Sequence, residues 1–272
     1  MSNFEEAPAR TTEEDLGSWE EFQSRVAEFD DATRENWDES WFRGQSDARW
    51  PLNSTLERRS KKITAVRDYL RVIREIKPTV EMFTGSVFEM PCLGEVEKSC
   101  GEYDRFDSFL FKSTTYMTQL RHGGFPSPLL DWTKSPYVAA YFAFSRAQDN
   151  GKVAIYAYRE RPQNWKVMGS DEPQIVSFGP IIKTHKRHFR QQSRYTMCLK
   201  FEGDKWLFEP HQSVFGFKAY EKQDLLWKMT LPASERLKAM RYFDKVNLNE
   251  FTLFDTEEGL LEMLAVRVMD MR

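Results

Sequence analysis

The feature that most constrains the fold of this 272-residue chain is one short segment that is apolar on almost every side. After Ser135 and Pro136 the sequence reads YVAAYFAFSRA. Ser135 can accept hydrogen bonds from the amides of a first helical turn, and proline suits the first helical position, so we expect a helix to begin here. A helix without a polar face has to be buried. The other elements must therefore pack around residues 136–146.

The rest of the chain supplies both helices and strands. Apolar residues recur at steps of three and four in 19–29 and 63–73, which predicts an amphipathic helix in each. Further helices are expected at 107–121, 235–246 and 257–269, strands at 40–44, 152–158, 194–201, 211–220 and 225–231, and a loop at 84–104. Helices dominate the first half and strands the second, so the predicted class is α+β.

The formal net charge of −3 is the sum of two unlike regions. Residues 1–40 hold 13 acidic residues and 3 arginines, whereas the remainder holds 36 basic and 29 acidic residues. We therefore expect an acidic helical arm at 1–40 and a domain at 41–272. The basic domain could bind a polyanion or a phosphorylated cofactor. The arm is either a regulatory segment that covers this domain or a solvated helix.

Several protein classes are disfavoured by features that the sequence lacks. It has no apolar run long enough to span a bilayer and no apolar core after a basic N-terminus, so we expect neither a membrane protein nor a secreted one. The three cysteines form no CxxC pair and the histidines have no ligand set around them, which predicts reduced thiols, no metal site and a cytoplasmic location. The absence of Walker, GxGxxG, GxSxG and HExxH motifs disfavours four common enzyme classes.

The junction before the buried helix is the first candidate site. Asp131 and Thr133 stand two residues apart at the end of an expected strand, so their side chains face the same way. Groups at a strand-to-helix junction often point at a ligand. In the alternative interpretation, Thr133 and Ser135 only cap the helix while Asp131 pairs with a buried arginine.

The segment FRGQ at 42–45 is the second candidate site. Arg43 at a strand end offers a fork of donors, and Gly44 allows another backbone to approach closely. This combination suits a phosphate or carboxylate that is bound by two parallel hydrogen bonds. The alternative is a structural ion pair of Arg43, with Asp131 as its partner.

Two basic segments are candidate contacts for nucleic acid. Residues 57–77 carry eight lysines and arginines and three acids, and all eight basic residues lie within 58–77. Residues 183–200 carry six lysines and arginines, two histidines and no acid, interleaved with Phe189 and Tyr195. Charge and stacking together could hold an anionic strand. The alternative is an ordinary solvated surface.

Taken together, these motifs resemble the FRG-domain family, which is named for its (F/Y)RG motif. FRGQ at 42–45 matches that motif and is followed by WPL at 50–52. QLRHGGFPSPLLDWT at 119–133 is similar to a family signature of the form QHxGxPTRLLDWT, and QQS at 191–193 resembles a Gln-Gln-Gly/Ser segment. The resemblance spans about 41–264, and the Leu-Leu-Asp-Trp-Thr block is its most specific part.

A further similarity, to ADP-ribosyltransferases of the Arg–Ser–Glu type, implies an activity. Those enzymes have a Tyr-Arg-Gly strand, a Ser-Thr-Ser strand before an Ala/Phe helix, and a Gln-x-Glu strand. FRG, DWTxS and QQS follow in the same order here. The resemblance implies a single domain with a split β-sheet core flanked by helices, which uses NAD as substrate and no metal.

The same resemblance implies roles for individual residues. Arg43 would hold a phosphate or ribose, Thr133 and Ser135 would position the nicotinamide ribose, and an aromatic side chain would stack on nicotinamide. The residues expected to bind NAD are Arg43, Gly44, Gln45, His122, Asp131, Thr133, Ser135, Tyr137 and Tyr141. Because the third motif lacks a glutamate, the catalytic candidates that would orient the acceptor are Gln191, Gln192 and Glu209.

The implied function is an NAD-dependent mono-ADP-ribosyltransferase, as in a toxin or phage-defence effector. Its acceptor would be RNA, DNA or a protein, and an inhibitor or antitoxin protein would be a further partner. The alternative is a non-catalytic module that binds nucleic acid or a nucleotide through the same basic surface.

Overall fold

A computed structural model describes residues 11–34, 40–100, 106–148, 150–160, 172–178, 186–216 and 224–271. Its helices are α1 (Trp19–Arg34), α2 (Thr55–Arg59), α3 (Val66–Thr84), α4 (Leu93–Cys100), α5 (Phe106–His122), α6 (Pro136–Phe144), α7 (Lys186–Arg190), α8 (Arg236–Lys245), α9 (Glu250–Phe254) and α10 (Glu257–Ala265). Its strands are β1 (Thr11–Asp15), β2 (Ser40–Gln45), β3 (Leu130–Thr133), β4 (Lys152–Arg159), β5 (Gln174–Phe178), β6 (Ser193–Glu202), β7 (Lys205–Phe208) and β8 (Leu225–Pro232).

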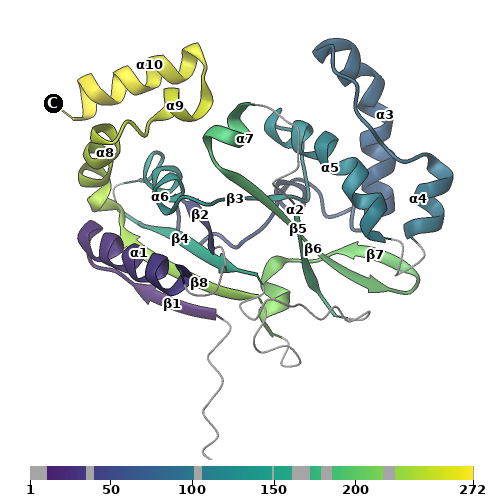
Figure 1. Cartoon of the computed structure of the whole chain (residues 1–272), viewed down its shortest axis with the longest axis horizontal. Coiled ribbons are helices and arrows are strands. Elements are labelled where there is room, and N and C mark those ends of the chain that lie inside the picture. The colour runs from purple at the N-terminus through teal and green to yellow at the C-terminus, as the bar shows by residue number, and fades with distance from the viewer. Residues whose placement is uncertain are drawn as a thin grey trace, which may run out of the picture.

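One mixed sheet runs through the molecule in the order β1-β8-β4-β2-β3-β6-β5, with β7 paired to β6 (Figure 1). The helices α1, α6 and α8 pack on one face of the β2, β4 and β8 half. The helices α3, α4 and α5 pack on the half that contains β5, β6 and β7. The chain therefore has a mixed helix-and-strand architecture with two helical groups on one sheet.

The two halves of the sheet meet weakly between β2 and β3. β2 pairs with β4 along all six residues, whereas β2 and β3 share a single pair, Phe42 with Thr133. The next step of an antiparallel ladder would join Arg43 to Trp132, but it is not formed. Instead, an Arg43 side-chain nitrogen donates to the backbone oxygen of Asp131 at 2.8 Å. The sheet thus opens at the arginine of the FRG motif.

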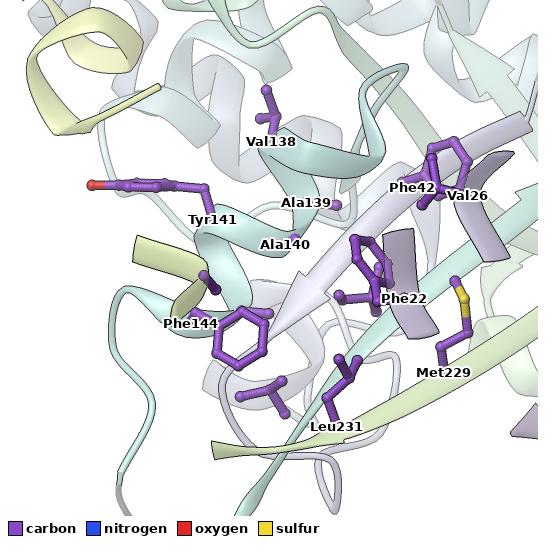
Figure 2. Close-up of a cluster of buried hydrophobic side chains, with 14 of the residues drawn as sticks. Phe22, Val26, Phe42, Val138, Ala139, Ala140, Tyr141, Phe144, Met229 and Leu231 are labelled. Carbon is purple, nitrogen blue, oxygen red and sulfur yellow. The ribbon is translucent and has the colours of Figure 1, made fainter. Parts of the chain in front are cut away.

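The α6 helix is buried, as its apolar sequence predicts. Ser135 caps it by accepting a hydrogen bond from the Val138 amide at 3.3 Å. Figure 2 shows its side chains within a cluster that also holds Phe22 and Val26 of α1 and Phe42 of β2. The helix backbone lies directly on Gly44, where an added Cβ would be 1.9 Å from the carbonyl oxygen of Ala139. Gly44 is therefore required by the close approach of α6 to β2.

The acidic N-terminal region is part of the core, which corrects the expected division into an arm at 1–40 and a domain at 41–272. Trp19, Phe22, Val26 and Phe29 of α1 are buried against α6 and the sheet. β1 pairs in parallel with β8. Among the described acids of this region, Glu13 pairs with Lys228 and Glu20 with Lys238. Residues 1–10 and 35–39 lie outside the described residues.

Most of the expected elements are present, but two expectations were wrong. Residues 84–104 were expected to form a loop, yet α4 occupies 93–100 because Val96 is buried against α3 and α5. Residues 211–216 of the expected 211–220 strand form a 3₁₀ helix, and 217–220 lie outside the described chain. The strands β5 and β7 were missed. Within the described residues, no helix is both long and apolar enough to cross a bilayer.

Candidate functional site

A cavity of about 450 Å³ lies where β2 and β3 separate. Its wall is formed by strand ends, the ends of α2 and α5, the far end of α6 and parts of α7 and α9. The lining residues used below are Arg43, Gly44, Gln45, Trp50, Arg58, Arg121, His122, Asp131, Thr133, Phe142, Ser145, Arg146, Arg187, Gln191, Glu250 and Phe254. A volume of this size is typical of small-molecule sites.

Arg43 is a half-buried cation on the cavity wall. Its Nη1 donates to the Asp131 backbone oxygen, while its Nε is buried and has no hydrogen-bond partner among the described residues. Burial is the main cause that lowers the pKa of Arg43 to about 10; Asp131 opposes this shift, and the charges of Arg121 and Arg58 contribute to it. The guanidinium is still charged at neutral pH, so it is a positive group that lacks a full set of partners.

Asp131 pairs with a different arginine. Its Oδ2 accepts from Arg121 at 2.5 Å, while its Oδ1 is buried without a hydrogen-bond partner in the described part of the chain. The alternative of an ion pair is therefore correct for Asp131, but its partner is Arg121 and not Arg43. Arg43 contacts only the backbone oxygen of Asp131.

The charge of the described cavity wall is strongly positive. It holds five arginines and two carboxylates, which leaves an excess of three positive charges before His122 is considered. The five arginines are Arg43, Arg58, Arg121, Arg146 and Arg187, and the carboxylates are Asp131 and Glu250. Such a wall favours an anion, since buried charges are stable only when they are paired.

The hydroxyls of the junction are engaged in structural hydrogen bonds. Thr133 Oγ1 donates to the backbone oxygen of Gln191 at 2.6 Å and accepts from the Ser135 amide at 3.1 Å. The Ser135 hydroxyl caps α6. Asp131 and Thr133 both line the cavity, as their spacing predicts. The contacts of these side chains match the alternative interpretation, in which they hold the junction together.

Three expected site residues line a separate pocket of about 370 Å³. They are Ser135, Tyr137 and Gln192. Tyr137 packs on the aromatic rings of Trp19, Phe22 and Tyr242 and belongs to the core edge. Gln192 is exposed and adopts a φ of 49° after α7. The order of the motifs along the chain did not show that these three residues line a different pocket from Arg43.

Of the catalytic candidates, Gln191 reaches the cavity and Glu209 does not. Gln191 lines it and donates to the backbone oxygen of Leu253 at 3.4 Å. The Glu209 amide donates to the Cys198 oxygen, and Cys198 lies five residues beyond Ser193 on β6. That separation is about 16 Å at the rise of an extended strand. Glu209 therefore lies too far from the cavity, measured along β6, to supply the missing carboxylate there.

The Tyr141 hydroxyl lies at the edge of the buried cluster, as Figure 2 shows. The hydroxyl donates to Glu250 Oε2 at 3.0 Å. Burial, and then the charge of Glu250, raise the pKa of this phenol well above its ordinary value. Tyr141 lines a neighbouring cavity of about 430 Å³, which also contains Glu250. Glu250 lines both cavities and is a carboxylate that the sequence reasoning missed.

Several other lining residues were also missed. Arg58 and Arg187 lie within the two basic segments, and Arg121 lies within the QLRHGG motif, so the sequence held a signal for each. Arg146 and Glu250 had no comparable signal. Arg146 follows the end of α6, and Glu250 opens the short helix α9 more than 100 residues away.

The basic segments do not form one continuous cationic surface in the described residues. On α3, Arg71 pairs with Glu97 at 2.9 Å and Lys77 pairs with Glu81 at 2.6 Å. In the second segment, Arg190 pairs with Asp255 at 3.0 Å, and residues 183–185 lie outside the described part. Within these segments, Arg58 and Arg187 are the described cations that line the cavity.

The fold and the site together define a mixed helix-and-strand protein whose central sheet opens into an arginine-rich cavity. Residues 38–152 match the family model of the FRG domain. The matched region contributes Arg43, Arg58, Arg121, Asp131 and Arg146, whereas Arg187, Gln191 and Glu250 lie beyond it. No curated protein and no solved structure matches the chain.

Proposed function

We propose that the arginine-lined cavity binds NAD and that the protein transfers ADP-ribose to an acceptor. The observation that carries this proposal is the excess of three positive charges around the incompletely satisfied Arg43. A diphosphate supplies negative charge and several acceptor oxygens, and guanidinium groups bind such oxygens in pairs. The FRG motif and the order of the three motifs support the same assignment.

The described wall also contains aromatic side chains, which suit a dinucleotide that carries an aromatic base at each end. Trp50 is 48% exposed at the cavity, and Phe142 and Phe254 also line it. Aromatic side chains stack on nucleobases. Such rings could therefore receive the adenine or nicotinamide of a dinucleotide whose diphosphate lies on the arginines.

Glu250 is the proposed replacement for the carboxylate that the third motif lacks. Cleavage of the bond between nicotinamide and ribose builds positive charge on the ribose, so a fixed carboxylate lowers the energy of the transition state. In the described wall the carboxylates are Asp131 and Glu250, and Asp131 is already paired with Arg121. Glu250 accepts a hydrogen bond from Tyr141, which holds it in place. Gln191 remains a candidate for orienting the acceptor.

The test is incubation of the full chain with labelled NAD and with RNA, DNA and protein acceptors. We expect nicotinamide release, transfer of label to one acceptor, and loss of both in Arg43→Ala. Loss of one charge-assisted contact should weaken NAD binding about ten- to a hundredfold. Glu250→Gln should retain binding and lose turnover. Arg49→Ala is the matched control, because Arg49 is exposed and pairs with Asp47 outside the cavity lining.

The same experiment separates this proposal from a non-catalytic binding module. NAD binding that depends on Arg43, without nicotinamide release, would identify the cavity as a nucleotide sensor. Absence of NAD binding would overturn the proposal.

A further inference from the structure

A tyrosine hydroxyl is held between two histidines beside the cavity. The Tyr195 hydroxyl lies 2.9 Å from His122 Nε2 and 3.1 Å from His188 Nδ1. His122 ends α5 and lines the cavity, Tyr195 is fully buried on β6, and His188 is buried in α7. The rings of His188 and Tyr195 stack at 5.6 Å. The end of α5 thus meets α7 and the start of β6, about 70 residues later in the chain, at one phenol.

The single proton of the phenol couples the two imidazoles. The hydroxyl can donate to one ring nitrogen and accept from the other, so one histidine must present N–H and its partner a lone pair. If His122 takes up a proton, its Nε2 becomes a donor. The phenol must then donate to His188 Nδ1, which selects the His188 tautomer with its proton on Nε2. A change of charge at the cavity wall is thereby transmitted to α7.

His188 and Tyr195 both stay neutral in their surroundings, so the exchangeable charge of the bridge is assigned to His122 as part of the inference below. Burial, His122 and Arg194 lower the pKa of His188, and burial raises the pKa of Tyr195 above its ordinary value, so both remain neutral near pH 7. His122 shares the cavity wall with the excess of arginines, which opposes a further positive charge until an anion arrives. The charged and titratable groups around the bridge are Arg43, Arg121, Asp131, Arg187, His188, Arg194 and Tyr195.

We propose that His122 is a proton-linked anion ligand of the cavity and that Tyr195 is the positioning residue that couples it to His188. An anion in the cavity offsets the arginine charges, so His122 binds a proton as the anion binds. The protonated imidazole adds a sixth cation to the described wall. The site therefore prefers anions of higher charge as the pH falls. This inference rests on the anion site of the proposed function and adds a means of regulating it.

The experiment is calorimetric titration of the full chain with sulfate and with NAD, whose phosphate groups keep a constant charge across the neutral pH range. Measurements in buffers of different ionisation enthalpy report the protons taken up. We expect proton uptake, and an affinity that rises as the pH falls, by at most tenfold per pH unit for one linked proton. His122→Gln should abolish both, while Arg49→Ala should retain both.

A second readout follows the imidazoles directly. The chain has four histidines, so their NMR signals can be assigned by substitution. Added sulfate should move the signals of His122 and His188 in the wild type, and only those of His122 in Tyr195→Phe. Signals of His188 that still move in Tyr195→Phe would refute the coupling.

The outcomes distinguish this inference from the proposed function. Sulfate binding with proton uptake, but without NAD binding, would uphold the inference and overturn the NAD assignment. NAD binding without proton uptake, or with uptake unchanged in His122→Gln, would overturn the inference alone. Failure of both ligands to bind would overturn both.

Discussion

The two adjoining cavities on either side of Glu250 have nearly the same size and opposite charge. The cavity at Arg43 measures about 450 Å³ and its neighbour about 430 Å³. Both include Ser145, Arg146, Glu250 and Phe254. In the described residues the first holds five arginines and two carboxylates, whereas the second holds one arginine and three glutamates.

This difference shows that volume alone does not identify the anion site. The two cavities share a wall formed by the end of α6 and the start of α9, so the same backbone serves both. The sign of the charge is set by side chains from elsewhere: Arg43, Arg58 and Arg121 on one side, and Glu258 and Glu262 on the other. Anion binding should therefore respond to substitutions on the first side only.

The largest expected effect comes from a substitution that displaces α6, which forms part of the wall shared by the two cavities. Gly44→Ala would place a Cβ 1.9 Å from the Ala139 oxygen, so α6 has to shift away from β2 and both cavities should change shape. Overpacking of this kind costs about 1–3 kcal/mol or more of unfolding free energy. Urea denaturation measures the loss. Gly94→Ala is the control, since a Cβ there meets no described atom within 4 Å and lies in a helix, so its stability should be unchanged or higher.

A substitution of intermediate expected effect tests whether the opposite charges of the two cavities determine anion binding. Arg121→Ala removes the partner of Asp131, so the cavity loses a cation and retains an unpaired, half-buried carboxylate. We expect sulfate affinity to fall about tenfold or more, because the loss of one charge-assisted contact costs about 1.5–3 kcal/mol. Glu258→Gln, on the other cavity, should leave the affinity unchanged. Equal losses in the two variants would show that the cavities do not act separately.

The smallest expected effect concerns the residue that the two cavities share. Tyr141→Phe removes the hydrogen bond to Glu250 and should lower the unfolding free energy by about 1 kcal/mol. Because the carboxylate then loses a donor, the turnover proposed for Glu250 should fall more than NAD binding. Thermal denaturation and steady-state kinetics would measure the two effects. A loss of stability with unchanged kinetics would assign Tyr141 a purely structural role.

The part of the fold that the sequence predicted best is the part governed by local rules. The buried helix after Ser135 and the amphipathic helix at Trp19 follow from periodicity and capping, and both are present. β5 and β7 are short strands of five and four residues, whose pairing depends on β6, so their local pattern is weak. The apolar stripe of α1 was recognised, but the negative charge of residues 1–40 led to the expectation of a separate arm.

For the candidate site, too, local sequence patterns predicted some residues and missed those whose position depends on tertiary packing. Arg43, His122, Asp131 and Gln191 lie on one cavity, as the motifs predicted. Tyr137 and Gln192 do not, because the register of a helix and a turn decides which way a side chain points. Glu250 could not be predicted, since its position depends on the packing of α9 against α7 and α6, and no motif marks it.

The parallel pairing of β1 with β8 has a consequence for synthesis. Asp15 hydrogen-bonds Thr230, 215 residues later in the chain. At translation rates of 5–20 residues per second, roughly 10–40 s pass before the partner strand of β1 exists. During that interval the ribosome-bound chain carries an unpaired strand and the exposed aromatic stripe of α1. Because like charges repel, we expect the 13 acidic residues among the first 40 to oppose association of this segment with a neighbouring nascent chain until its partner strand has been made.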